Sequence, residues 1–215
     1  MMTTTRFGEK KYIPVFMLFM LMLSFTSCLP KLDPGPAPER LLLKPAMPGE
    51  SGGRPSSRQL VIATPSAASD IDNDRIALVY QGREVRYLSG ARWSGSLVTL
   101  MQRLIIEAVE SSKSLAGVGD EMAGIAADAR LVSDIRQFSL EYAAEGVPPV
   151  ARFSATFRLM DLSRARVIGT REIDVTAPAA GRENAQMARA LESALEKGLA
   201  ELSAWVVESM RSLRK

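Results

Sequence analysis

The residue types that usually carry chemistry are scarce in this 215-residue chain. It has no histidine, which excludes Ser-His-Asp and Cys-His catalysis and histidine ligation of zinc. Asp70, Asp72 and Asp74 alternate like the start of a calcium loop. Such a loop needs glycine at its sixth position and glutamate at its twelfth, where this chain has Arg75 and Gln81. We therefore assign no catalytic residue, no metal ligand and no cofactor, and expect a protein that is not an enzyme.

One cysteine, Cys28, directly follows a short apolar run near the N-terminus. A basic start, an apolar middle and small residues before a processing point are typical of a secretory signal peptide. The cysteine after Thr26 and Ser27 resembles the lipobox of bacterial lipoproteins. This pattern predicts a signal peptide at 1–27, cleavage before Cys28 and attachment of lipid to its thiol. The alternative is an uncleaved anchor, but the apolar run at 12–25 is shorter than the ~20 residues that span a bilayer.

The charge of the chain does not favour a nucleic-acid partner. The predicted signal peptide contains Arg6, Lys10 and Lys11 against Glu9, so most of the net charge of +3 lies in the part to be removed. Nucleic-acid binding needs basic residues clustered on one face, and the mature chain shows no such cluster. With Cys28 lipidated, no cysteine remains for a disulfide, so the packing of the core must stabilise the domain.

The mature chain divides into a spacer and one domain. Residues 28–39 contain four prolines and are predicted to form an extended tether. Residues 40–215 are long enough to bury one core and are predicted to form a single domain. Within it, residues 45–58 are rich in glycine, serine and proline and are expected to form a flexible loop.

The first half of the domain combines short strands with a helix. Strands are expected at 40–45, 59–63 and 75–80, and 85–88 is expected to pair back on 75–80 as a hairpin. After Trp93 the apolar spacing changes to that of a helix, which begins near 97 with Ser94 or Ser96 as its N-cap. Residues 115–127 are small and rich in glycine and alanine, and are expected to form a loop.

The second half predicts three long strands and a long helix. Strands are expected at 130–142, 153–159 and 167–175, with Val167, Ile173 and Val175 on one face of the last strand. In the first of them the apolar alternation slips by one residue, which predicts a β-bulge near Arg136–Gln137. Apolar residues at helical spacing predict a helix over 184–213. The fold class is α+β: a single domain with an antiparallel sheet of about five to six strands and two helices packed on one face.

Two sets of residues leave alternatives open. Trp93 and Trp205 are expected in the core, although either could contact a partner. Five arginines on two neighbouring strands form either a solvated face that protects the sheet or a basic face for an acidic partner. These are Arg152, Arg158, Arg164, Arg166 and Arg171.

Several tracts of the chain resemble one family of envelope proteins. The first strand with Arg40-Leu41-Leu42-Leu43, the strands from Ile76 to Tyr87, and Ala91-Arg92-Trp93-Ser94 before the first helix resemble its first half. The tract from Asp128 to Phe138 and the alanine-rich last helix resemble its second half. With the lipobox and tether, this order is similar to the ABC-type transport auxiliary lipoprotein family.

The resemblance implies a partner protein of a transport system that is not itself catalytic. Such systems combine an ABC permease and ATPase with a substrate-binding protein of the mammalian-cell-entry type, and move phospholipid-like molecules between two membranes. That substrate-binding protein is the expected partner, and a homo-oligomer is compatible with the sequence. Contact is expected through an exposed strand edge or an apolar patch whose residues are not identified from the sequence.

The position after Cys28 bears on location. Leu29, rather than aspartate, implies retention at the outer membrane, facing the periplasm. One alternative is a structural envelope lipoprotein that links the outer membrane to peptidoglycan or serves another envelope machine. A carboxylate-dependent enzyme is the third hypothesis.

Overall fold

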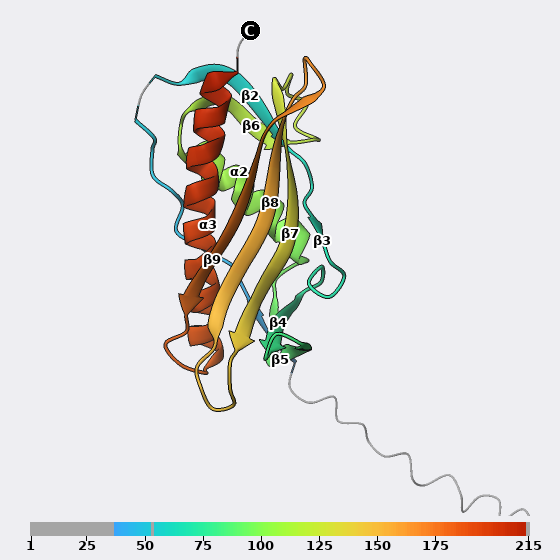
Figure 1. The fold of residues 1–215 in the computed structure, drawn as a ribbon, viewed down its shortest axis with the longest axis vertical. Helices are drawn as coiled ribbons and strands as arrows, with labels where there is room; N and C mark the ends of the chain where they lie inside the picture. The colour runs from blue at the N-terminus through green and yellow to red at the C-terminus, as the bar shows by residue number, and fades with distance from the viewer. Residues whose placement is uncertain (1–36, 53, 214–215) are drawn as a thin grey trace, which may run out of the picture. The chain divides into compact units, whose positions relative to one another are not determined.

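The computed structural model describes residues 37–52 and 54–213 (Figure 1). Cys28, the predicted signal peptide and most of the tether lie outside these residues. The part from Pro38 onward forms one compact α+β unit with a sheet and two helices, which confirms the predicted fold class. The elements are β1 (Glu39–Leu41), β2 (Ser56–Ile62), β3 (Ser66–Ala67), β4 (Arg75–Tyr80), β5 (Glu84–Trp93), α2 (Leu97–Ser111), β6 (Leu115–Asp120), β7 (Ala129–Tyr142), β8 (Val150–Asp161), β9 (Arg166–Pro178) and α3 (Asn184–Ser212).

The sheet is mixed rather than wholly antiparallel, and it has nine strands in the described residues. Along one edge β7 pairs antiparallel with β8, and β8 with β9, as the sequence predicts. Along its other edge β7 pairs in parallel with β2, β3 and β4 in turn. Parallel neighbours must be joined by crossovers, so they come from distant parts of the chain. The alternation of apolar and polar residues within a strand does not indicate which distant strand pairs with it, so the parallel pairs could not be predicted from it.

The prediction of a loop over 115–127 is wrong for the first six of these residues, which form strand β6. β6 pairs in parallel with β2, from Ser56–Leu115 to Ile62–Asp120. Its sequence is weak in β-forming residues, so the backbone pairing with β2 decides its conformation. Similarly, β2 begins at Ser56, so the loop expected at 45–58 ends earlier.

The bulge predicted near Arg136–Gln137 is confirmed. The register of β7 against β8 shifts between Ile135 and Gln137, and Arg136 has no partner in the ladder. Before the bulge Leu131 and Ile135 are buried, and after it Phe138 is buried. The extra residue therefore keeps apolar side chains in the core on both sides of the shift.

A second bulge makes the predicted buried face of β9 wrong at Val167. The register against β8 shifts between Leu159 and Met160, which pair with Gly169 and Val167. Ile168 is therefore the residue that packs against the core, and Val167 is 49% exposed instead of facing inward. Ile173, further along the strand, is buried as expected.

The helices pack against each other and against the strands. The predicted helix over 184–213 corresponds to α3, and Glu183 and Gln186 form a capping box at its start. Gly198 lets α3 approach β8 closely, because a Cβ there would lie 2.5 Å from an atom of the Phe153 ring. The Ser203 hydroxyl donates to the carbonyl of Ala108 on α2 at 3.1 Å.

Both tryptophans contribute to packing, as expected. Trp93 is 2% exposed, and its ring lies 5.9 Å from that of Phe138. Trp205 is partly buried against the core and lies close to Gly169. Ser96 is the N-cap residue of α2, although its side chain makes no cap hydrogen bond. Within 37–52 and 54–213, neither helix is long and apolar enough to cross a membrane.

Candidate functional site

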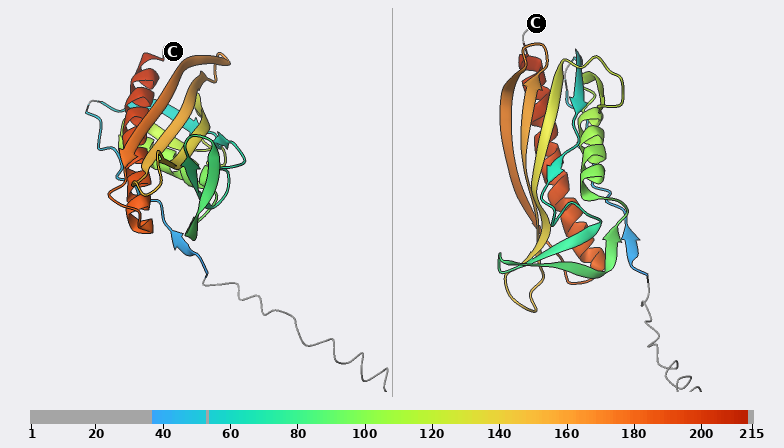
Figure 2. Two further views of the ribbon diagram at one scale, coloured as in Figure 1. Left: turned by 60° about the horizontal axis from the view of Figure 1, so that its bottom comes forward. Right: turned by 90° about the vertical axis from the view of Figure 1, so that its right-hand side faces the viewer.

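The long strands give the domain two separate ends. The near end contains the β4–β5 turn, the β7–β8 turn and the start of α3, and it is where the described chain begins (Figure 1). There β1 pairs with residues 91–93 of β5, and Figure 2 (right) shows the β4–β5 hairpin crossing below the sheet. The far end contains the β6–β7 loop, the β8–β9 turn and the end of α3. A strand as long as β7 separates the two by roughly 45 Å.

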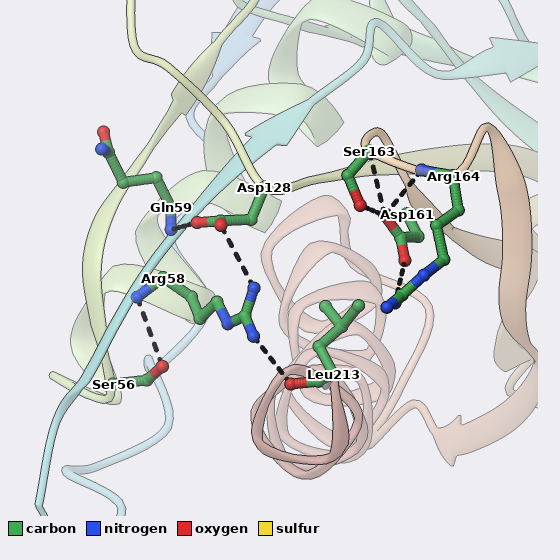
Figure 3. A network of polar contacts seen from close by, with 8 residues as sticks. All are labelled: Ser56, Arg58, Gln59, Asp128, Asp161, Ser163, Arg164 and Leu213. Carbon is green, nitrogen blue, oxygen red and sulfur yellow. Dashed lines mark hydrogen bonds and ion pairs between the residues drawn. The ribbon is translucent and has the colours of Figure 1, made fainter. Parts of the chain in front are cut away.

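Arg58 holds three elements together at the far end (Figure 3). Its Nη1 donates to Oδ1 of Asp128 at 3.2 Å, and its Nη2 donates to the carbonyl oxygen of Leu213 at 2.7 Å. The other carboxylate oxygen of Asp128 accepts the backbone N–H of Gln59 at 2.8 Å. A guanidinium at the C-terminus of a helix is favoured by the helix dipole. The contacts therefore fix β2, the start of β7 and the end of α3 relative to one another.

Asp161 organises the neighbouring β8–β9 turn. Its Oδ1 accepts hydrogen bonds from the hydroxyl and the backbone N–H of Ser163 and from the backbone N–H of Arg164, at 2.6, 2.9 and 3.1 Å. Its Oδ2 accepts one from the Arg164 guanidinium at 3.2 Å. The side chain is 2% exposed, and these donors, the Ser163 hydroxyl first, lower the pKa of the carboxyl. Ala165 completes the turn with a φ of 49°.

The two networks meet in one backbone contact. The N–H of Leu162 donates to the carbonyl of Asp128 at 3.1 Å, so the turn is tied to the loop that precedes β7. The Leu162 side chain is nevertheless 44% exposed. Two further apolar side chains are exposed at this end, Met122 at 91% and Val167 at 49%. A shallow pocket of about 400 Å³ opens beside them, lined by Arg164, Arg166, Ile168, Ser212 and Leu213.

This far-end patch, defined by Met122, Leu162 and Val167, suits docking better than catalysis. Exposed apolar side chains held on fixed turns can be buried by a partner at little cost in conformational entropy. Among the described residues no group of three potential metal-ligating side chains comes together. Sequence patterns did not identify Met122 or Leu162, because their exposure depends on which elements cover them.

The strand edges differ in how they are protected. α3 lies along β9, where Lys197 Nζ donates to the Thr176 carbonyl at 2.8 Å and Arg171 pairs with Glu201 at 2.6 Å. β6 has β2 as its one strand neighbour in the described part of the chain, so its outer edge is open at the far end. An open edge of this kind can accept a strand from a partner.

Three of the five arginines are paired with carboxylates. Arg152 pairs with Asp174 at 2.6 Å and with Glu141 at 3.5 Å, and these partners, Asp174 first, raise the pKa of its guanidinium. Arg164 and Arg171 also have carboxylate partners. The paired charges favour the solvated outer face over a surface for an acidic partner.

Comparison with solved structures places this fold among known ones. Protein XCC0632 from Xanthomonas campestris is similar, with 27% identity and a TM-score of 0.72, covering 80% of this chain and 96% of that chain. An uncharacterized protein matches at 12% identity and a TM-score of 0.62, covering 81% and 99%. CT253 from Chlamydia trachomatis matches at 10% identity and a TM-score of 0.51, covering 74% and 100%. The last two likenesses show the fold alone.

Comparison with families is more specific. No curated protein matches the chain. The model of the family described as the ABC-type transport auxiliary lipoprotein component matches residues 41–203, from the end of β1 into α3. Since this match covers well over half of the sequence, the chain belongs to the ABC-type transport auxiliary lipoprotein component family.

Proposed function

We propose that the protein is the outer-membrane-anchored accessory lipoprotein of an ABC transport system with a substrate-binding protein of the mammalian-cell-entry type. The system would move phospholipid-like molecules between the two membranes, and this protein would act by docking and binding. Membership of the auxiliary lipoprotein family is the observation that carries the proposal. The signal peptide and Cys28 supply the anchor, and the compact domain from Pro38 supplies the docking part.

The far end supports a docking role for this domain. The chain joins the domain through β1 at the near end, so a partner from the opposite membrane would meet the surface away from that junction. Leu162 and Met122 are exposed there on turns fixed by Asp161 and Asp120. Beside them β6 has an open edge. Apolar anchors next to an open strand edge provide both burial and backbone hydrogen bonds.

Site-specific crosslinking in intact cells tests the partner. A photoreactive residue at Leu162 or Met122 should capture the mammalian-cell-entry-type protein, whereas one at Arg158, exposed on the outer face, should not. Purified protein should show no turnover of its own. Capture of peptidoglycan or of an unrelated envelope machine from Leu162 would replace the transport function with a structural one.

The anchor is tested separately at Cys28. We expect Cys28→Ser to abolish incorporation of labelled palmitate and to leave the precursor uncleaved or the protein free of membranes. A serine variant that still takes up the label, or still fractionates with the outer membrane, would refute lipid attachment at this residue.

A further inference from the structure

The near end carries a hollow whose lining differs from that of the far-end patch. It has a volume of about 550 Å³ and lies between the β4–β5 turn, the β7–β8 turn and the start of α3. The rings of Tyr80 and Tyr142 stack there with their centroids 4.7 Å apart and their planes 4° apart. The charged lining residues of the hollow are Arg83, Arg86 and Arg182, together with the carboxylates Glu84 and Glu145.

Three arginines line this hollow from different segments. The Arg86 guanidinium lies 4.8 Å from the centre of the Tyr80 ring and is held by Glu84 at 2.7 Å. Arg83 and Arg182 are exposed, and neither has a carboxylate partner within residues 37–52 and 54–213. Two guanidinium groups therefore remain available to an anion at this site. A guanidinium binds phosphate oxygens in a bidentate manner.

Exposed apolar side chains lie on the same segments as the hollow. Val147 in the β7–β8 turn is 50% exposed, Val85 on β5 is 42% exposed and Val150 at the start of β8 is 37% exposed. Val150 also lines an adjacent hollow of about 370 Å³ together with Tyr142. Arginines, tyrosines and exposed aliphatic groups at one end of the domain match the composition of proteins at the lipid headgroup layer.

We propose that the near end is a membrane-contact surface, and that Arg83 and Arg182 bind the phosphate of a phospholipid headgroup in the hollow beside the tyrosine stack. The inference rests on the lipid anchor proposed at Cys28 and is independent of the transport partner. The twelve residues from Cys28 to Glu39 span about 37 Å as an extended proline-rich tether. They join the domain at β1, which pairs with residues 91–93 of β5, whereas Glu84 and Arg86 of the same strand line the hollow roughly 20 Å away. The tether is longer than this separation, so the surface that carries the hollow can reach the bilayer.

The test uses the lipidated full-length mature protein reconstituted in vesicles of phosphatidylethanolamine and phosphatidylglycerol. Since Cys28 is blocked by its lipid, Val147→Cys and Leu162→Cys each place one reactive thiol at the near or the far end. A fluorophore at position 147 should be quenched several-fold more strongly by headgroup-labelled lipid than one at position 162. Equal quenching at the two positions would overturn the proposal.

Arginine variants identify the groups responsible. Arg83→Gln with Arg182→Gln should abolish the excess quenching at position 147, whereas Arg158→Gln with Arg166→Gln makes the same change in charge on exposed sites elsewhere and should preserve it. If both pairs behave alike, the hollow does not bind the headgroup. Inorganic phosphate competes for the same guanidinium groups, so it should reduce the excess quenching at position 147 only when it is in large excess over the headgroups. Complete loss of the excess quenching at a phosphate concentration equal to that of the headgroups would indicate a site for a soluble anion and would overturn the proposal.

Palmitate labelling of each preparation separates the two proposals. A fully lipidated protein without excess quenching refutes the membrane-contact surface alone. If a photoreactive residue at position 162 does not capture the mammalian-cell-entry-type protein, the proposed transport partner alone is refuted.

Discussion

The near and far ends of the domain are built by different means from the same strands. At the far end, a carboxylate that is 2% exposed fixes a turn, and the surface there combines exposed aliphatic side chains with a shallow pocket lined by Arg164 and Arg166. At the near end, stacked tyrosines line a hollow together with arginines from three segments. β7, β8 and β9 run through both ends. One continuous sheet can therefore hold two surfaces of different chemistry at a fixed separation.

The substitution with the largest expected effect on the stability of both ends is Phe157→Ala. Phe157 is fully buried in the middle of β8, between the two ends. Its loss should lower the free energy of unfolding by about 3–5 kcal/mol. Denaturant unfolding of the mature chain carrying Cys28→Ser measures this value, and hydrogen exchange should rise at both ends together.

A matched control is the exposed neighbour Arg158, where Arg158→Ala should change the free energy of unfolding by less than about 0.5 kcal/mol. A cost below about 1 kcal/mol for Phe157→Ala, or faster exchange at one end alone, would show that the two ends do not share one core.

Arg58→Ala should affect the far end alone. It removes the charged hydrogen bonds to Asp128 and Leu213 and should lower the free energy of unfolding by about 1–2 kcal/mol. Hydrogen exchange should increase in the last turn of α3 and stay unchanged in the β4–β5 hairpin. Arg54→Ala, an exposed arginine nearby, is the control. Equal effects of the two substitutions would deny Arg58 a structural role.

Tyr80→Ala should affect the near end alone. It removes the stack on Tyr142 and should lower the free energy of unfolding by about 1 kcal/mol. Faster hydrogen exchange should be confined to β4 and β5, and Tyr80→Phe should retain the wild-type rates because it keeps the ring. Faster exchange in the β8–β9 turn would contradict the separation of the two ends.

The smallest effects concern acid and salt. Neighbouring donors lower the pKa of Asp161 at the far end, and Arg152 lowers that of Asp174 on β9. A lowered folded-state pKa means that the contribution to stability is complete above the unfolded value and lost as the pH falls through the folded one. Both contributions should therefore fade below about pH 4.

Salt should distinguish the two carboxylates. Asp174 is 48% exposed and its pair with Arg152 is worth at most about 1 kcal/mol, which 1 M salt should screen. The Asp161 side chain is 2% exposed, so its contribution to the free energy of unfolding should be unchanged in 1 M salt. Unfolding of Asp161→Asn and Asp174→Asn at low and high salt measures the difference. A salt-sensitive Asp161 would mean that the far-end turn is open to solvent.

Elements with local signals could be predicted from the sequence. The apolar spacing of α3 and the phase slip at Arg136 depend on residues within one segment, and both are present in the structure. The parallel pairing of β2 and β4 with β7 depends on contacts across the chain, which a local pattern does not contain. β6 has the composition of a loop and becomes a strand through its pairing with β2.

The candidate surfaces were less accessible to sequence reasoning. Leu162 and Val147 are apolar residues of a kind usually found in a core. They are exposed because no other element covers the turns that carry them. Arg83 and Arg182 are 99 positions apart in the sequence, and the fold brings them to one hollow. The predicted lipid attachment at Cys28 is a different case, because it rests on a linear sequence pattern alone and the residue lies outside the described part of the chain.

The bulge in β7 also bears on how the length of this chain can change. Arg136 is the extra residue, so its deletion would join Ile135 to Gln137 and leave a regular ladder with β8. Every core residue on either side would keep its orientation. Deletion of a residue of β7 outside this bulge would turn part of the strand over, because side chains alternate with a period of two. Arg136 is thus the point in β7 where evolution can remove a residue without exchanging the inside and the outside of the sheet.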